Sequence, residues 1–402
     1  MNILQITNKA LFPPDGGTLA ISNFAYAYAK LNHNVTILSM VTHKHYLNNL
    51  DSSDLLEKKI ELIGVKVNTK ISLFKLLKNL FFSKIPYNLE RFISIDFAEK
   101  LTSLLKEKKW DIIQIEGLYV LSYIDLIRKN SLGKIVYRPH NIEYKIWEEN
   151  ANCSKSIIKT VYFGILAKRL KNFELNLLNT YDIVLPISNS DADFYKENGN
   201  NKPILVSPFG VNVREFKSYF VQPEKLNTNS TILFIGALDW IPNQQGLTWF
   251  IDKCFPLIVN LIPNVELIIA GRNAPKWYFK KFNSKNINFI GQVNNAYEFL
   301  SKSGPVIAPL FSGSGMRVKI IEAMALKKAI VTTTKGAEGI DGLNPNNILI
   351  ADNANIFAEM VVKLLRNNDL QNNMGNLAHK LIIEQYSVEK IGSLAIQFIN
   401  QN

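Results

Sequence analysis

The chain has 402 residues, of which 47% are hydrophobic and 20% are charged, a composition typical of a folded protein that excludes a disordered one. This length exceeds one ordinary core, so we expect two domains. The formal net charge of +12 is evenly shared, because residues 1–200 hold 26 basic and 20 acidic side chains and residues 201–402 hold 20 and 14. With dispersed basic residues and no recognisable binding module, nucleic acid is not an expected partner.

The sequence also lacks signs of export, membrane spanning or cysteine-based stabilisation. The N-terminus MNILQITN enters a strand-like run without the regions of a secretory signal, and no uncharged apolar run reaches about 18 residues. Cys153 and Cys254 lie in opposite halves and form no C-x-x-C motif, so neither a disulfide framework nor a zinc site is expected. These features favour a cytoplasmic protein.

Short apolar runs alternate with helical stretches through the first half of the chain. A strand at NILQIT is followed by a turn, a helix over residues 18–31 and a strand at NVTILSM. Continuous Val, Ile and Leu runs are typical of strands buried on both faces, and their alternation with helices predicts a parallel sheet. The other strands expected in this half are WDIIQIEG, KIVYRPHN, YDIVLPIS and PILVSPFGV.

The same pattern restarts after a polar stretch at residues 224–230, which we interpret as the domain boundary. ILFIGAL precedes a helix over residues 245–261, and the strands VELIIAG, INFIGQV, PVIAPL, AIVTTT and NILIAD follow. We therefore expect an α/β fold with two Rossmann-like, doubly wound domains, whose ligands bind beyond the carboxyl ends of the strands. The expected division is residues 1–222, residues 223–385, and a C-terminal helix at residues 386–402 that packs back on the N-terminal domain.

One stretch, residues 62–89, contains no acid. Its central part, ISLFKLLKNLFFSKI, predicts a basic amphipathic helix. Two interpretations stay open: the helix lies in a membrane interface, or its apolar face packs on the core and its lysines point into water. The lysines interleaved with Leu, Ile and Phe are Lys66, Lys70, Lys75, Lys78 and Lys84.

The segment FSGSGMRVKIIEAMALKKAIVTT combines a glycine-containing turn with a helix expected to begin near Met316. Free backbone N–H groups and the positive end of the helix dipole would point to one spot, which favours a phosphate. Gly313 and Gly315 permit close backbone approach, while Arg317 offers a bidentate fork and Lys319 a point charge. These groups together suit a diphosphate.

Glu322 is expected about two turns into this helix, among apolar neighbours. A carboxylate beside a phosphate is repulsive unless it binds another group, and a ribose diol can donate two hydrogen bonds to it. The combination therefore describes a nucleoside diphosphate. The alternative is a capped helix with solvated charges.

This segment resembles the donor-site motif of the retaining GT-B glycosyltransferases, specifically glycosyltransferase family 4 and its subgroup with a GSGxRxKxxEAMA pattern. The resemblance implies two Rossmann-like domains that face a cleft, a UDP- or GDP-sugar donor on the C-terminal domain and an acceptor on the N-terminal domain. It also implies retention of configuration without a metal or cofactor. Supporting pieces span nearly the whole chain, namely PPDGG, RPHNIEY, PISNSDADFY, SPFGVNVREF, FIGALDWIPNQQGLTWF, IIAGRN, FIGQVNNAYEFL and TTKGAEGI.

The resemblance assigns roles to single residues. Glu322 is similar to the second Glu of the family's E-x7-E motif, which binds the donor ribose, and His140 matches the histidine that faces the donor sugar. Arg317 and Lys319 are similar to cations at the diphosphate, so Arg317, Lys319 and His140 are the expected catalytic residues. The other expected donor-binding residues are Gly236, Arg272, Val293, Gly313, Ser314, Gly315, Met316 and Val318.

The chain departs from the broad family at two places. The first Glu of E-x7-E falls at Ser314, so the resemblance does not indicate which sugar is transferred. Ala237, with Gln244 or Gln245, stands where the broad family often has Arg and Lys. Arg317 is therefore expected to carry the phosphate charge together with the lysine two residues later.

In the first half, Asp15, Gly16 and Gly17 of PPDGG resemble the family loop that approaches the donor phosphates and the acceptor. A plain strand-to-helix turn that uses glycine for positive φ is the alternative.

The DAD sequence at residues 191–193 looks like the metal-binding D-x-D of the other large glycosyltransferase fold. We expect it instead in the first turn of a helix capped by Ser188 or Ser190, because the helix dipole favours acids there. No metal site is expected.

These features predict a hexosyltransferase that moves a sugar from a nucleoside diphosphate sugar to a glycan or lipid-linked glycan in cell-surface polysaccharide synthesis. Departure of the diphosphate is the hard step, so preorganised positive charge should dominate catalysis. A lipid-linked acceptor would explain residues 62–89 as a peripheral contact to the inner face of the membrane. The alternatives are a non-catalytic nucleotide-sugar-binding protein and an epimerase or phosphorylase of the same fold.

Overall fold

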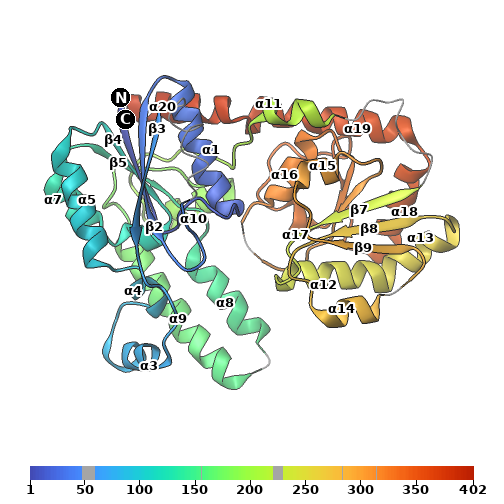
Figure 1. Ribbon diagram of the computed structural model, residues 1–402, viewed down its shortest axis with the longest axis horizontal. Helices are drawn as coiled ribbons and strands as arrows, with labels where there is room; N and C mark the ends of the chain where they lie inside the picture. Colours follow the sequence, from blue (N-terminus) through green and yellow to red (C-terminus); the bar gives the residue numbers. More distant parts are fainter. Residues whose placement is uncertain (48–58, 155, 221–229, 283, 314) are drawn as a thin grey trace. The chain divides into compact units, whose positions relative to one another are not determined.

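The chain forms two compact units, Met1–Gly210 with Val388–Asn402 and Val211–Ser387. Each unit contains one six-stranded parallel sheet surrounded by helices (Figure 1). The boundary expected at residues 224–230 lies outside the described residues apart from Ser230. The computed structural model describes residues 1–47, 59–154, 156–220, 230–282, 284–313 and 315–402.

The sheet of the first unit has strands that are buried on both faces, as their runs of Ile, Leu and Val predict, apart from the partly exposed edge strand β3. The strands are β1 (Asn2–Thr7), β2 (Asn34–Val41), β3 (Ile60–Lys66), β4 (Ile112–Glu116), β5 (Lys134–Arg138) and β6 (Ile183–Val184). Their order is β3-β2-β1-β4-β5-β6, the doubly wound arrangement, in which Ile3 of β1 lies opposite Val35 on one side and Ile112 on the other. The order reverses between β1 and β4, so the crevice beyond their carboxyl ends is the expected ligand site.

Helices connect these strands and cover the sheet (Figure 1). They are α1 (Gly16–Lys30), α3 (Leu73–Phe82), α4 (Tyr87–Glu90), α5 (Ile95–Glu107), α6 (Leu118–Leu121), α7 (Ile124–Asn130), α8 (Glu143–Cys153), α9 (Ile157–Asn176), α10 (Asn189–Glu197) and α20 (Val388–Gln401). The last of these, α20, packs on α1: a Cβ atom at Gly392 would lie 2.5 Å from Cβ of Ala27, and Lys30 Nζ is 2.8 Å from Glu389 Oε1. The chain therefore ends on the unit in which it begins.

The second unit repeats this arrangement. Its strands are β7 (Thr231–Ile235), β8 (Glu266–Ala270), β9 (Ile287–Gly291), β10 (Val306–Ala308), β11 (Ile330–Thr332) and β12 (Leu349–Ile350), in the order β12-β11-β10-β7-β8-β9. The order reverses between β7 and β10. The helices are α11 (Val213–Phe216), α12 (Ile241–Trp249), α13 (Phe255–Leu261), α14 (Lys276–Lys281), α15 (Ala296–Leu300), α16 (Val318–Ala325), α17 (Thr334–Ala337), α18 (Ala354–Leu365) and α19 (Asn368–Leu381), with 3₁₀ segment η2 (Lys217–Tyr219) and π-helical segments η4 (Phe250–Cys254) and η5 (Ile382–Tyr386).

The expected elements are confirmed with a few corrections. PILVSPFGV is not a strand: its strand-like contacts are two isolated bridges, Ile204 with Val184 and Val211 with Ser387. The helix expected over residues 245–261 begins at Ile241 and continues as α12, η4 and α13. In the part of the chain that the structure describes, no helix is long and apolar enough to cross a membrane.

Candidate functional site

The loop between β10 and α16 lies at the point where the second sheet reverses its strand order. Gly313 and Gly315 have φ of +92° and +79°, values that residues other than glycine rarely adopt. A Cβ atom at Gly313 would also lie 2.9 Å from Cζ2 of Trp240. The helix begins at Val318 rather than near Met316, so Met316 belongs to the loop. Ser314 lies outside the described residues.

Arg317 occupies the N-cap position of α16 and is only 5% exposed. Its Nη2 atom donates to the carbonyl oxygen of Gly313 at 2.8 Å, and its guanidinium carbon lies 5.6 Å from the ring centre of Trp240. The Arg317 side chain therefore holds the loop in shape while it brings positive charge to the start of the helix.

Lys319 provides the second positive charge, one turn from the loop. Its Nζ atom is 2.8 Å from Oδ1 of Asn243 and 4.9 Å from the ring centre of Phe234. Burial, and next the neighbouring charge of Arg317, lower the pKa of Lys319 to about 7. The Lys319 side chain thus lies in surroundings that favour the neutral amine until an anion binds.

Gly236 follows β7 and makes room for the amide that holds Lys319. A Cβ at Gly236 would lie 2.7 Å from Nδ2 of Asn243, which also donates to the carbonyl oxygen of Ala237 at 2.9 Å. Asn243 therefore links the loop after β7 to α16. The sequence does not single it out, although it stands in the motif GALDWIPN.

Glu322 is the fifth residue of α16, one turn into the helix rather than two. Its Oε1 atom accepts a hydrogen bond from the Tyr297 hydroxyl at 3.1 Å, and burial raises the pKa of Glu322 to about 7. Tyr297 comes from α15 and packs edge-on against Phe216 at 4.7 Å between ring centres. No role for Tyr297 was predicted from the sequence. The one signal for it was its place in VNNAYEFL, which is part of a segment that resembles the family.

The two remaining donor-site candidates lie at the ends of neighbouring strands. Val293 follows β9 and lines a pocket of about 240 Å³ with Asn295. Asn295 caps α15, the helix that carries Tyr297. Arg272 follows β8 with an exposed side chain, and its carbonyl oxygen accepts from Leu238 N at 2.9 Å.

His140 belongs to a buried polar cluster at the carboxyl ends of β4 and β5. Its Nε2 atom is 2.6 Å from Oε2 of Glu116, to which Arg138 Nη1 also donates at 3.1 Å. Glu116 Oε1 accepts from Gln114 Nε2 at 2.5 Å and from Gln5 Nε2 at 3.2 Å. Glu116 ends the predicted strand WDIIQIEG, a position from which it could have been identified.

The charges of this cluster neutralise one another. Burial disfavours the ionised form of Glu116, but Arg138 and His140 outweigh it and hold its pKa below the ordinary value. Burial also lowers the pKa of His140, which is therefore neutral at pH 7. Because Nε2 faces a carboxylate, we assign the proton to Nε2, which leaves Nδ1 as an acceptor for a ligand.

Asp15 is the N-cap of α1 and forms a capping box with Thr18, whose backbone N–H donates to Asp15 Oδ1 at 2.8 Å. Lys9 Nζ and His45 Nε2 each lie 3.1 Å from Asp15 Oδ2. Burial opposes ionisation of Asp15, but the bonds from His45 and Lys9 prevail and hold its pKa well below the ordinary value. Asp15 is thus fully engaged by its neighbours.

Gly16 and Gly17 are the first two residues of α1, and neither has a positive φ. The alternative of a turn that needs glycine for positive φ is therefore wrong. What glycine provides is space, because a Cβ at Gly17 would lie 2.6 Å from Lys9 Nζ.

The DAD sequence lies in the first half of α10. Ser188 Oγ accepts from Asp191 N at 3.2 Å and donates to Asp191 Oδ2 at 2.8 Å, while Asp193 pairs with Lys196 at 3.2 Å. These contacts are those of a capped helix. Within the described ranges, no three His, Cys, Asp or Glu side chains gather as a metal site would require.

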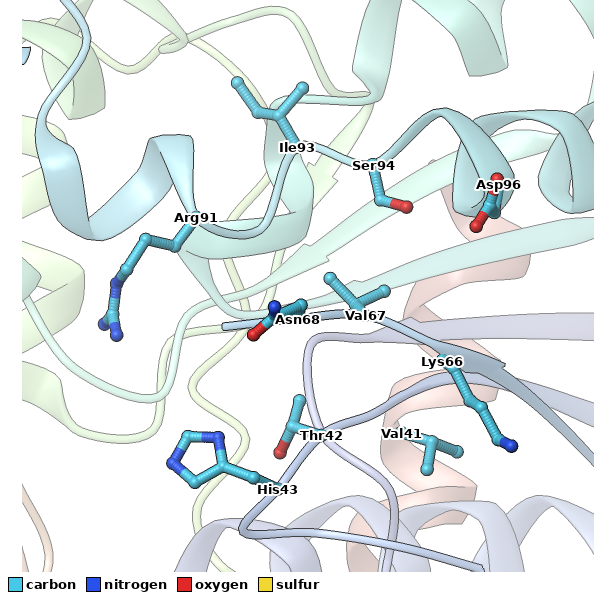
Figure 2. A pocket seen from close by; sticks show the side chains of 10 residues that line it. All are labelled: Val41, Thr42, His43, Lys66, Val67, Asn68, Arg91, Ile93, Ser94 and Asp96. Atoms are coloured by element: carbon cyan, nitrogen blue, oxygen red, sulfur yellow. The ribbon is translucent and has the colours of Figure 1, made fainter. Parts of the chain in front are cut away.

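The first unit also contains a pocket of about 570 Å³ (Figure 2). It lies at the carboxyl ends of β2 and β3 and extends to the segment between α4 and α5. Arg91 stands at its edge, where Nη1 donates to the carbonyl oxygen of Thr69 at 2.7 Å. The lining side chains are Val41, Thr42, His43, Lys66, Val67, Asn68, Arg91, Ile93, Ser94 and Asp96.

Comparisons with known proteins agree with this geometry. Residues 229–367, which include Lys319 and Glu322, match the model of a family described as glycosyl transferases group 1. A Klebsiella pneumoniae protein described as "Uncharacterized 44.6 kDa protein in cps region" is 25% identical over 310 residues, which are 75% of this chain and 77% of that protein.

Solved structures show the same fold. HepE of Anabaena, in complex with UDP and glucose, is 13% identical with a TM-score of 0.67, and the match covers 99% of both chains. Sucrose-phosphate synthase from Thermosynechococcus elongatus is 13% identical with a TM-score of 0.71, covering 100% of this chain and 99% of that one. The predicted GT-B fold is confirmed, and the family match and fold together support a GT-B glycosyltransferase.

Proposed function

We propose that the protein is a retaining, metal-independent glycosyltransferase of the family 4 type. It transfers a sugar from a UDP- or GDP-sugar to a glycan or lipid-linked glycan in cell-surface polysaccharide synthesis. The observation that carries this proposal is the pair Lys319 and Glu322, both with a pKa near 7, at the strand-order reversal of the second sheet. The cps-region relative and the UDP complex of HepE are consistent with it.

In the proposed donor complex, the diphosphate lies against the first turn of α16. Backbone N–H groups at this helix start and the protonated Lys319 side chain would bind the phosphate oxygens. The donor ribose would donate hydrogen bonds to the Glu322 carboxylate, which replaces its present bond from Tyr297 or shares the site with it. Arg317 would act through the loop shape that it maintains and through its charge.

In the proposed reaction, the bond between the anomeric carbon and the diphosphate oxygen breaks as the acceptor oxygen bonds to that carbon from the same face. The departing diphosphate gains negative charge, which Lys319 and the helix start stabilise. The proton of the acceptor hydroxyl passes to the departing phosphate oxygen. His140, held by Glu116, would face the donor sugar with its free Nδ1.

For the acceptor we propose the pocket of the first unit shown in Figure 2. Its volume lies in the range of ordinary small-molecule sites, about 300 to 1,000 Å³. Its polar lining offers both donors and acceptors of hydrogen bonds, as a sugar requires. Lys66 and Arg91 outnumber the one acid, Asp96, so the pocket favours an acceptor that carries negative charge.

The direct test is nucleotide release from UDP- and GDP-sugars, measured with and without a lipid-linked glycan acceptor. Acceptor-dependent release that Lys319→Ala abolishes, and that the matched control Lys363→Ala on α18 leaves unchanged, would support the proposal. Tight donor binding without release would indicate a nucleotide-sugar-binding protein. Turnover without acceptor, or only with inorganic phosphate, would indicate an epimerase or a phosphorylase.

A further inference from the structure

Helix α3 turns its apolar side chains outward. Leu73, Phe74, Leu77 and Phe81 are 75%, 77%, 49% and 73% exposed, and Phe82 is 85% exposed. Leu73, Leu77 and Phe81 recur every four residues and share one face of the helix. The interpretation in which this apolar face packs on the core is therefore wrong.

Polar contacts hold the inner side of α3, where Asn79 lies between the half-buried Leu76 and Leu80. The buried Asn79 donates from Nδ2 to the carbonyl oxygen of Ile85 at 2.9 Å. Arg169 of α9 donates to the carbonyl oxygens of Asn79 at 3.2 Å and Leu80 at 2.7 Å. These contacts fix the orientation of the helix, so the exposed apolar face is built into the fold.

The start of α9 has the same pattern. Ile157, Ile158, Val161 and Ile165 are 83%, 83%, 57% and 37% exposed, with the spacing n, n+1, n+4 and n+8 found in α3. Figure 1 shows α3 and the start of α9 at the same end of the N-terminal unit, and Arg169 joins the two helices. Two segments far apart in the sequence therefore present exposed apolar side chains at this end of the unit.

The charges within both segments have a single sign. Residues 62–89 contain no acid, and residues 150–173 contain none either. The lysines on these segments with exposed side chains are Lys66, Lys70, Lys75, Lys78, Lys84, Lys159 and Lys168. Exposed apolar side chains flanked by lysines are typical of a surface that inserts into the headgroup region of an anionic membrane.

We propose that α3 and the start of α9 form a docking surface for an anionic lipid bilayer, with the apolar side chains in the interface and the lysines on the headgroups. The partner is a bilayer because two acid-free segments with exposed lysines and exposed apolar side chains match a sheet of anionic headgroups. This proposal is independent of the glycosyltransferase assignment. The pocket of Figure 2 is linked to this docking surface by a hydrogen bond. Arg91 of its lining donates to the carbonyl oxygen of Thr69, and Thr69 precedes the N-cap of α3 by three residues.

The test is co-sedimentation of the full chain with vesicles of phosphatidylcholine alone or mixed with phosphatidylglycerol. We expect binding to the anionic vesicles that weakens with salt. Phe74→Ser with Phe81→Ser, and Ile157→Ser with Ile158→Ser, should each reduce binding about tenfold or more. Lys75→Glu with Lys78→Glu should reduce it at least as much, since each lysine near an anionic surface contributes about fivefold.

The matched control is Leu132→Ser with Lys129→Glu, at an exposed site of the same unit. It should bind vesicles as the unchanged protein does. All substituted side chains are exposed, so circular dichroism and Tm should stay the same and separate loss of binding from loss of folding.

Three outcomes would overturn the proposal. The unchanged protein does not bind anionic vesicles, or it binds neutral and anionic vesicles equally. In the third outcome, the phenylalanine variant converts an oligomer to a monomer without any vesicle binding, which would make the surface a contact between copies of the chain. Each outcome is independent of donor turnover, so failure here and failure of the proposed reaction are distinguishable.

Discussion

The charged residues at the two strand-order reversals form two clusters, which differ in whether hydrogen-bond partners stabilise their charged forms. In the first unit, Glu116 is fully buried but bonded to Arg138 and His140, and its pKa stays below the ordinary value. In the second unit, burial moves the pKa of Lys319 and of Glu322 to about 7, toward the neutral form of each. The carboxylate of the first cluster already has its partners, whereas the charges of the second are electrostatically prepared for a ligand.

This difference indicates which cluster stabilises the fold and which cluster binds a ligand. A buried charge that already has its partners contributes position and shape. A buried charge whose pKa is shifted by desolvation gains most when an opposite charge arrives. We therefore expect substitutions in the first cluster to affect stability and substitutions in the second to affect ligand binding.

The largest expected effect is on folding. Glu116→Ala leaves Arg138 buried without its carboxylate, which should lower the free energy of unfolding by about 3–5 kcal/mol. Urea denaturation measures this directly. Glu116→Gln keeps the shape and should cost less, and a Glu116→Ala protein as stable as the unchanged one would show that the first cluster is not a structural unit.

The next effect is on turnover. Lys319→Ala should lower kcat/KM for the donor by about 10²–10³, the range found when one group that stabilises a developing negative charge is removed. Steady-state nucleotide release provides the measurement. Lys319→Arg keeps the charge and should retain more activity, while Lys363→Ala should change nothing. Equal rates for Lys319→Ala and the control would remove Lys319 from the site.

The pH dependence of nucleotide affinity should also distinguish the two clusters, with a smaller effect. Below pH 7 Glu322 takes up a proton, which leaves a weaker acceptor with fewer accepting sites for the ribose, and above pH 7 Lys319 loses its charge. Affinity for a nucleoside diphosphate should therefore peak near pH 7 and fall by up to about tenfold per pH unit on each side. Calorimetric titration between pH 6 and 8 tests this.

Two variants should show which residue causes the acidic fall and which causes the alkaline fall in nucleotide affinity. Lys319→Arg should remove the alkaline fall, since arginine stays charged, and Glu322→Gln should remove the acidic fall. The pKa of Glu116 is held below its ordinary value, which already lies under this range, so Glu116 should not contribute to the profile. Affinity that does not vary between pH 6 and 8 would contradict the assignment.

The smallest effect concerns the acceptor pocket. Lys66 is an exposed residue of its lining, so Lys66→Glu should raise KM for an anionic acceptor several-fold while KM for the donor stays the same. Acceptor titration at saturating donor measures both values. A change in KM for the donor alone would show that the pocket has another role.

Patterns within one segment were predictable from the sequence. The strand runs, the glycine turn at Gly313 and Gly315, and the position of Glu322 on an apolar helix all follow from local spacing. Contacts between distant segments were not: Tyr297 reaches Glu322 from 25 residues away, and Glu116 lies 24 residues from His140. Their side chains meet only once the strand order brings their loops together.

Two errors have a common physical origin. PILVSPFGV is apolar enough for a strand, but in the fold it makes isolated bridges at its two ends, Ile204 with Val184 and Val211 with Ser387, and no strand. The amphipathic pattern of α3 does not state which face is inward, and here Asn79, held by Arg169, lies inward with the half-buried Leu76 and Leu80. In both cases the tertiary surroundings, rather than the pattern of apolar residues, decide the outcome.

The measurement that tests the donor site most directly is a thermal-shift series with UDP, GDP and ADP on the unchanged protein, Lys319→Ala and Glu322→Ala. If the second cluster binds the donor, one nucleotide at about 100 times its Kd should stabilise the unchanged protein by about 2.7 kcal/mol and raise Tm by several degrees. Both variants should lose most of this shift. No shift with any nucleotide, or equal shifts in all three proteins, would contradict a donor site at Lys319 and Glu322.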